Sequence, residues 1–160
     1  QLKKAVPVPC TKSDAYPECT VPETAVGLLN DSFKEYNVNS AGQQAALIAI
    51  MNFESSGFAY KTNLNPDNHG QGTYSQMQYP AIEGYVLSVP ALKTKYDSLT
   101  KTVTDENTLK DEVLKLAIAD QYVFGAAAWY LKKSGKCDES VWSALDKGDD
   151  AGFTKYIQCV

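Results

Sequence analysis

Residues 45–78 read AALIAIMNFESSGFAYKTNLNPDNHGQGTYSQMQ, and this stretch predicts an apolar helix followed by a polar loop. Steps of four, three and four residues place Leu47, Met51, Glu54 and Phe58 on one helical face. Gly57 is expected to end the helix, because glycine favours the position just after a helix C-terminus. The pattern therefore predicts a helix over about residues 41–56 that turns a carboxylate toward the core.

Glu54 is the candidate general acid of this stretch. Met51, Phe53 and Phe58 are expected to desolvate its carboxylate, and the negative end of the helix dipole lies close by. Both effects disfavour the ionised form, and enzymes use such surroundings to keep a Glu protonated for acid catalysis. The alternative is a solvated Glu at the end of a surface helix.

The loop after the helix carries a second acidic candidate, Asp67. Glycosidic hydrolysis needs a second group that activates water or attacks the sugar, and Asp67 lies in the loop expected to face Glu54. The alternative is structural, because the sequence Asn-Pro-Asp-Asn over residues 65–68 also favours a turn. His69, the single histidine, is expected to be a solvent-exposed loop residue.

Residues 73–79, TYSQMQY, alternate aromatic and amide side chains. As a strand, this segment would place Gln76 and Gln78 on one face and Met77 on the other. Aromatic rings stack on the apolar faces of pyranose rings, and amides bond to hydroxyl and N-acetyl groups. We therefore predict that Tyr74, Gln76, Met77 and Gln78 bind substrate.

Glu54-Ser55, a glycine-containing loop and then Met77-Gln78 resemble the goose-type lysozymes and the bacterial soluble lytic transglycosylases. Within that superfamily the sequence looks closest to small secreted fungal muramidases. The resemblance implies a mainly α, lysozyme-like α+β domain with one small β-hairpin beside the catalytic helix. It also supports Glu54 as the acid and Gln78 as a cleft residue. Ser75 and Gln76 depart from the family's Gly-Leu at these positions.

The later segment GAAAWYL, residues 125–131, resembles a Gly-Ala-Ala-Tyr-Leu motif on a helix behind the cleft of those transglycosylases. Aligned on the tyrosine, it places Val123 where the family usually has Asn. The resemblance makes Tyr130 a candidate to contact the sugar or Glu54. A buried packing tyrosine is the alternative.

The resemblance implies a muramidase that hydrolyses the β-1,4 bond between N-acetylmuramic acid and N-acetylglucosamine in bacterial peptidoglycan. Such a protein would be antimicrobial, would act on glycan strands and would need no cofactor. A lytic transglycosylase acting on the same bond is one alternative. A non-catalytic glycan-binding or effector domain is the other.

Composition excludes several function classes. The 160 residues fit one domain, 1–160, with a net charge of −4. All 15 basic residues are Lys, and no basic stripe stands out, so no nucleic-acid partner is expected. No apolar run is long enough to span a membrane, and one histidine without a C-x-x-C pair predicts no metal site. We expect a monomer.

Four cysteines near the two ends favour a secreted, extracellular protein with disulfides. Cys10–Cys19 and Cys137–Cys159 are expected because each closes a short loop, although sequence alone leaves the crossed pairings open. Asn30-Asp31-Ser32 is an N-glycosylation sequon. No N-terminal signal sequence is present, so Gln1 is read as a processed or engineered start. The proline-rich residues 1–22 predict an irregular strap held by the first disulfide; a linker stub is the alternative.

The remaining chain predicts further helices and no strong strand pattern. They are expected over residues 23–36, 80–89 and 107–119, then beyond a break at Asp120 to about residue 133, and in two short helices within 139–157. The small residues 125–128 are expected to let another helix approach closely.

Overall fold

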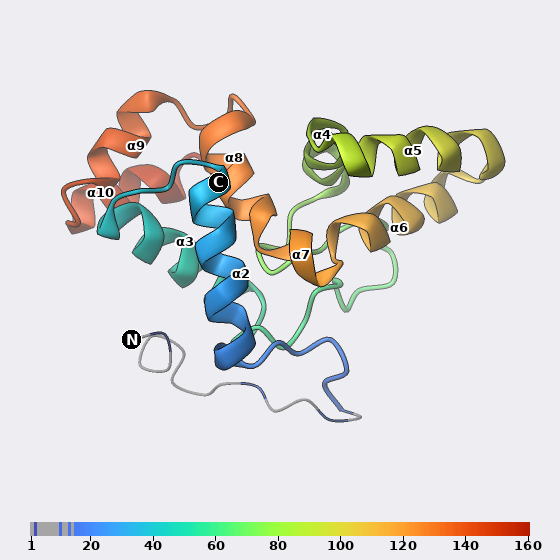
Figure 1. Cartoon of the computed structure of the whole chain (residues 1–160), viewed down its shortest axis with the longest axis horizontal. Helices are drawn as coiled ribbons and strands as arrows, with labels where there is room; N and C mark the ends of the chain where they lie inside the picture. The colour runs from blue at the N-terminus through green and yellow to red at the C-terminus, as the bar shows by residue number, and fades with distance from the viewer. Residues whose placement is uncertain (1, 3–9, 11–12, 14) are drawn as a thin grey trace.

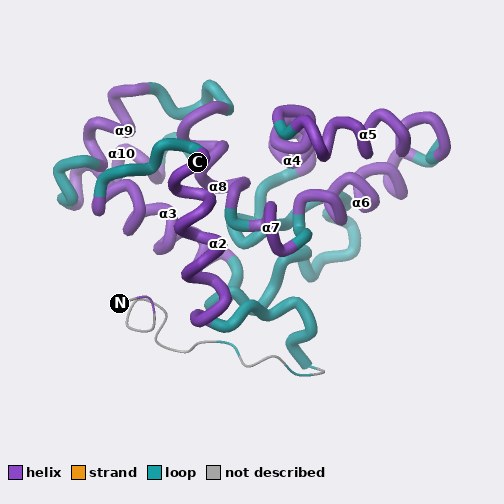
Figure 2. Tube along the Cα trace, in the orientation of Figure 1, coloured by secondary structure: helices purple, strands orange, loops and turns teal. Residues whose placement is uncertain are grey.

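The computed structural model describes residues 2, 10, 13 and 15–160, and their fold is mainly helical (Figures 1 and 2). This confirms the predicted helical class. From residue 15 onward the helices, in chain order, are α2 (Pro22–Glu35), α3 (Ala41–Glu54), α4 (Tyr79–Ser88), α5 (Pro90–Thr102), α6 (Glu106–Ala117), α7 (Asp120–Val123), α8 (Gly125–Lys133), α9 (Glu139–Leu145) and α10 (Asp150–Ile157).

The helices form two groups that meet at α8. Figure 1 shows α3, α9 and α10 on one side and α4, α5 and α6 on the other. Helix α8 contacts α2, α3, α4 and α7, and most of its side chains are buried. We call α2, α3, α9 and α10 the anchored group, and α4–α6 the three-helix arm. Helix α8 therefore packs against both the anchored group and the three-helix arm.

Local sequence explains where most helices begin. Ser40 accepts a hydrogen bond from the Gln43 backbone N–H and caps α3, and Asp105 caps α6 in the same way through Thr108. The predicted break near Asp120 is confirmed, since α6 ends at Ala117 and α7 begins at Asp120. Helix α5 was not predicted, because the expected helix over residues 80–89 is followed by Pro90, a residue that often ends a helix. Proline is also favoured in the first helical turn, and Pro90 begins α5.

The predicted β-hairpin is wrong, because the described residues form no β-strand. Thr62 and Met77 each pair with Gly72 in an isolated bridge only. Thr73 and Gln76 both have positive φ, so the chain turns back immediately after Gly72. The segment is therefore a tight turn, too short for the alternating strand that we expected.

Small residues on α8 allow the close helix contact that the sequence predicted. A Cβ placed at Gly125 would overlap the hydroxyl of Tyr85 on α4. Tyr85 is buried and donates a hydrogen bond to the Tyr122 carbonyl at 2.8 Å. Trp129, further along α8, packs against Gly84, where an added Cβ would lie 3.0 Å from its ring. These contacts join the arm to the centre of the molecule.

Both predicted disulfides, Cys10–Cys19 and Cys137–Cys159, are present. The first lies in the predicted strap, residues 1–22; positions 1, 3–9, 11, 12 and 14 of that strap, including Pro7 and Pro9, lie outside the described residues. In the described part of the chain, no helix has the length and apolar character needed to cross a membrane.

Candidate functional site

A cleft of about 750 Å³ lies between the anchored group and the three-helix arm. It is lined by the end of α3, residues 75–78, the first half of α4, α8 with the turn after it, and the C-terminal residues. This volume lies within the range of roughly 300–1,000 Å³ that is typical of small-molecule sites. The cleft is therefore the candidate binding site.

Glu54 lines this cleft, but its surroundings differ from the prediction. It is the last residue of α3, as expected, and it is exposed. Phe53, expected to shield it, is 79% exposed. Ser56, Gly57 and Phe58 all have positive φ, so the chain reverses direction after the helix and buries Phe58 without covering Glu54. The expected desolvation of the carboxylate is absent.

The cleft presents several polar side chains that have no partner among the described residues. Gln78 precedes α4 and is exposed, and its side chain does not cap the helix. Neither the Glu54 carboxylate nor the Lys136 ammonium forms an ion pair with a described residue, although both line the cleft. Tyr130, a predicted site residue, also lines the cleft and is half-buried. These groups are available to a ligand.

An aliphatic surface faces the same space. Ile50 comes from α3, and Ile157 and Val160 come from the C-terminal end. Ile157 and Val160 are 41% and 48% exposed, so the cleft keeps apolar area open to solvent. Ala81 on α4 also lines it. The cleft thus combines hydrogen-bonding groups with apolar patches.

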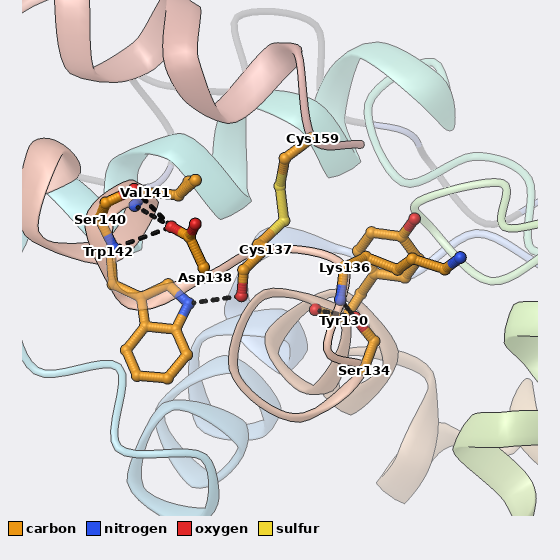
Figure 3. Close-up of a disulfide and its surroundings, with 9 residues drawn as sticks. All are labelled: Tyr130, Ser134, Lys136, Cys137, Asp138, Ser140, Val141, Trp142 and Cys159. Atoms are coloured by element: carbon orange, nitrogen blue, oxygen red, sulfur yellow. Dashed lines mark hydrogen bonds between the residues drawn. A yellow bond between two sulfur atoms is a disulfide. The ribbon is translucent and has the colours of Figure 1, made fainter.

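The Cys137–Cys159 disulfide positions two parts of the cleft wall (Figure 3). Lys136 directly precedes one cysteine and Val160 directly follows the other. The turn is held further by Ser134, whose hydroxyl donates to the Tyr130 carbonyl at 2.6 Å and accepts from the Lys136 backbone N–H at 3.1 Å. Figure 3 shows Tyr130, Ser134 and Lys136 together on one side of the disulfide. Lys136 and Val160 were not predicted as site residues, although each is adjacent in sequence to a cysteine of the predicted disulfide.

Tyr74, predicted to bind substrate, is a core residue. It is fully buried and lies 5.2 Å from Phe58 and 4.8 Å from Phe124 between ring centroids. Its hydroxyl donates to Thr20 Oγ1 at 2.5 Å, and burial raises the pKa of this phenol. The tight turn at residues 73–76 directs the ring inward, so the alternation expected of a strand does not apply.

The other predicted residues of this segment do line the cleft. Met77 is nearly buried, with 8% exposure. The Gln76 amide donates to the Thr73 carbonyl at 3.2 Å and accepts from Asn63 Nδ2 at 3.3 Å. Gln76 therefore stabilises the turn, whereas the side-chain amide of Gln78 forms no hydrogen bond with the described residues.

Asp67 does not line the cleft with Glu54. It lines a separate cavity of about 340 Å³, which we call the polar cavity, between residues 67–71, the start of α4 and the start of α6. Asp67 is exposed, and its backbone N–H donates to Asn65 Oδ1 at 3.1 Å, which is the turn geometry considered as an alternative. Two carboxylates lining different cavities do not form the expected pair.

His69 lines the polar cavity and is half-buried. The sequence had led us to expect a solvent-exposed residue at this position. Its Nδ1 lies 2.9 Å from Asp111 Oδ2 on α6. The other oxygen of Asp111 accepts from the Gly70 backbone N–H at 3.0 Å. The loop is therefore attached to α6 at two points.

The Asn30 sequon lies on α2, with Asn30 exposed. Ser32 is buried, and its hydroxyl donates to the Phe124 carbonyl at 3.0 Å. In the folded chain Asn30 and Asp31 are exposed and Ser32 is not, and glycosylation of Asn30 stays a prediction. Elsewhere in the described part of the chain, no three His, Cys, Asp or Glu side chains gather into a group that could hold a metal ion.

Comparison with known proteins finds one informative similarity. The chain is 35% identical over 144 residues to a bifunctional dioxygenase (DOX)-epoxy alcohol synthase (EAS) of the fungus Fusarium oxysporum (strain Fo5176). The match covers 88% of this chain but only 11% of that protein's length. No family model matches the chain. No solved structure matches it either.

These findings correct the interpretation of the sequence. The similar protein is named as an oxygenase and epoxy alcohol synthase, so the assignment to lysozyme-like proteins, and with it the muramidase and glycoside hydrolase activity, is wrong. The match gives no support to a lytic transglycosylase. The exposed Glu54 and the separate position of Asp67 agree with this correction, because both remove physical premises of the catalytic prediction.

Proposed function

We propose that this chain is a saccharide-binding domain and that its cleft holds part of a glycan strand, such as the aminosugar chain of peptidoglycan. The observation that carries the proposal is that one cavity combines apolar surface with polar groups that have no partner among the described residues. A pyranose ring has the same two characters, because its C–H faces are apolar and its rim carries hydroxyl and acetamido groups. Binding, without cleavage, is proposed.

The polar groups match an N-acetylated sugar in type. The Glu54 carboxylate accepts hydrogen bonds from hydroxyl or amide N–H groups, and the Gln78 amide both donates and accepts. Lys136 donates to carbonyl or hydroxyl oxygens. None of these side chains must break a described hydrogen bond to do so, which lowers the cost of binding.

The apolar groups are placed to take the C–H faces of the sugar. Ile50, Ile157 and Val160 supply aliphatic surface, and Trp129 and Tyr130 line the α8 side. Covering this surface would remove it from water at about 25 cal/mol per Å² of apolar area. Only part of this free energy contributes to affinity, because the rest offsets the entropy that the ligand loses on binding.

The relative supports a domain that works alongside other domains. A stretch similar to most of this chain lies within a much longer fungal protein. Neither activity in that protein's name is assigned to this chain, because the match spans about a tenth of its length. Two disulfides further support a secreted, extracellular protein. We also propose that it binds as a monomer.

Isothermal titration calorimetry with the tetrasaccharide of β-1,4-linked N-acetylglucosamine tests the proposal. Gln78→Ala and Lys136→Ala should each weaken binding by about fivefold to tenfold, as expected for one lost hydrogen bond, with charge assistance at Lys136. Lys133→Ala is the matched control, since Lys133 is exposed on α8 and does not line the cleft. Absence of binding to the tetrasaccharide and to intact peptidoglycan would refute the proposal.

A second candidate follows from the relative and the aliphatic wall. An epoxy alcohol, the product class in the relative's name, joins a carbon skeleton to two oxygen functions. Ile50, Ile157 and Val160 would contact the carbon chain, and Tyr130 or Gln78 would bond to the oxygens. Isothermal titration calorimetry with an epoxy alcohol on a long hydrocarbon chain decides between saccharide binding and epoxy-alcohol binding. Binding of that probe, with no response to the saccharide, would replace the first candidate.

A further inference from the structure

The polar cavity and the cleft are neighbours that share lining residues. Gln78 and Pro80 line both spaces, so the two lie on either side of the start of α4. A ligand that fills the cleft and passes over Gln78 enters the polar cavity directly. Only an elongated ligand does this, because each space has its own walls.

The polar cavity offers a different chemistry from the cleft. Its wall carries the Asp67 carboxylate and the amides of Gln78 and Asn107, which form no side-chain hydrogen bond with the described residues. His69 contributes a second ring nitrogen, because only Nδ1 is bonded to Asp111. These groups would bond to several hydroxyl or acetamido groups at once.

The charges in the polar cavity do not select for an ion. Asp67 and Lys110 have opposite signs, and Lys110 already pairs with Glu106 at 2.7 Å on α6. The Lys110 ammonium also lies 5.8 Å from the centre of the Tyr79 ring. A neutral ligand rich in hydrogen-bonding groups therefore fits better than a phosphate or a carboxylate.

The loop that forms the cavity is held in place before any ligand arrives. His69 and Gly70 both bond to Asp111, and Asn68 Nδ2 donates to Asn63 Oδ1 at 3.3 Å. Gly70 has a φ of +74°, and a Cβ there would meet the Tyr79 side chain at 2.6 Å. Glycine thus lets the loop approach α4 closely. A loop fixed in this way loses little entropy on binding.

We propose that the polar cavity is a second saccharide subsite that extends the cleft, so that the domain binds long glycan chains more tightly than short ones. This inference rests on the proposed saccharide binding in the cleft. It assigns the contacts beyond Gln78 to Asp67, His69 and Asn107, and it makes chain length the determinant of affinity.

A length series tests the subsite. The disaccharide, tetrasaccharide and hexasaccharide of β-1,4-linked N-acetylglucosamine are titrated into the protein and into Asn107→Ala. The variant should bind the hexasaccharide about fivefold more weakly, from the loss of one net hydrogen bond, and the disaccharide with unchanged affinity. Asn39→Ala is the control, because Asn39 is exposed and lines neither space.

Amide chemical shifts give an independent measurement. The hexasaccharide should shift the signals of His69 and Asn107, and the disaccharide should shift those near Gln78 and Lys136 only. Equal affinity for all lengths, with cleft variants still weakening binding, would overturn the subsite and leave the proposed function standing. No binding at any length would overturn both.

Discussion

The anchored group and the three-helix arm are stabilised in different ways. All four cysteines lie outside the arm, and Cys137–Cys159 joins the segment before α9 to the residues that follow α10. The arm is held by packing and by Glu83, whose carboxylate accepts from Tyr79 at 2.9 Å and from Tyr96 at 2.6 Å. The cleft takes residues from both groups, so its shape depends on a covalent bond on one side and on helix packing on the other.

Removing the Cys137–Cys159 disulfide should have the largest effect. The double variant Cys137→Ser, Cys159→Ser should lower the free energy of unfolding by about 3 kcal/mol, because the bond closes a loop with a sequence separation of 22. Binding to the cleft should also weaken, since Lys136 and Val160 flank the two cysteines. Urea unfolding and the tetrasaccharide titration measure the two effects.

The other disulfide provides the matched comparison. Cys10→Ser with Cys19→Ser opens a loop of separation 9 and should cost somewhat less stability. Neither Cys10 nor Cys19 lines the cleft, so the affinity for ligand should stay unchanged. Equal losses of affinity in both double variants would show that the second disulfide has no special role in positioning the cleft.

Gly125→Ala should weaken the contact between the arm and α8. The added methyl group would overlap the buried Tyr85 hydroxyl, and overpacking of this kind costs about 2 kcal/mol. Gly27→Ala on α2 is the control, because nothing lies within 4 Å of its added Cβ and alanine favours a helix by about 1 kcal/mol. Thermal unfolding should show opposite shifts for the two variants; shifts of the same sign would contradict the assigned contact.

Alkaline titration should show an effect that is confined to high pH and absent at neutral pH. Burial, followed by the charge of Glu35, raises the pKa of Tyr36 from 10.0 to about 12. The folded state therefore holds the phenolic proton more tightly than the unfolded state. This contribution to stability is complete below pH 10 and is lost as the pH rises toward 12.

Tyr36→Phe should reduce the loss of unfolding free energy between pH 10 and pH 12, measured by urea unfolding at each pH. In the arm, the hydrogen bond to Glu83, followed by burial, raises the pKa of Tyr96, which is partly exposed. Tyr96→Phe should change this pH dependence less than Tyr36→Phe does. The reverse order would contradict the burial difference between the two groups.

Local patterns predicted much of the fold. The helices around residues 23–54 and 107–133 follow from apolar spacing and caps, and both disulfides follow from short loop closure. Helix α5 was missed because Pro90 both ends α4 and begins the next helix. The hairpin was wrong because two residues with positive φ replace a strand with a turn.

The candidate site was predicted only in part. Residues Glu54, Met77, Gln78 and Tyr130 were placed in one site by sequence, and all four line the cleft. Asp67 was expected beside Glu54 and instead lines the polar cavity. Lys136, Ile50, Ile157 and Val160 come from segments far apart in the chain, and no single sequence motif brings them together.

The sequence by itself determined the helical class and the position of Glu54 at a helix end, and it favoured the two observed disulfide pairs, because each depends on residues close together in the chain. Tertiary structure decided which side chains are open to solvent. Three consecutive residues with positive φ after α3 leave Glu54 exposed, and the rings of Phe58 and Phe124 enclose Tyr74. Burial depends on packing between segments that are distant in sequence, and periodicity along one helix does not contain that information.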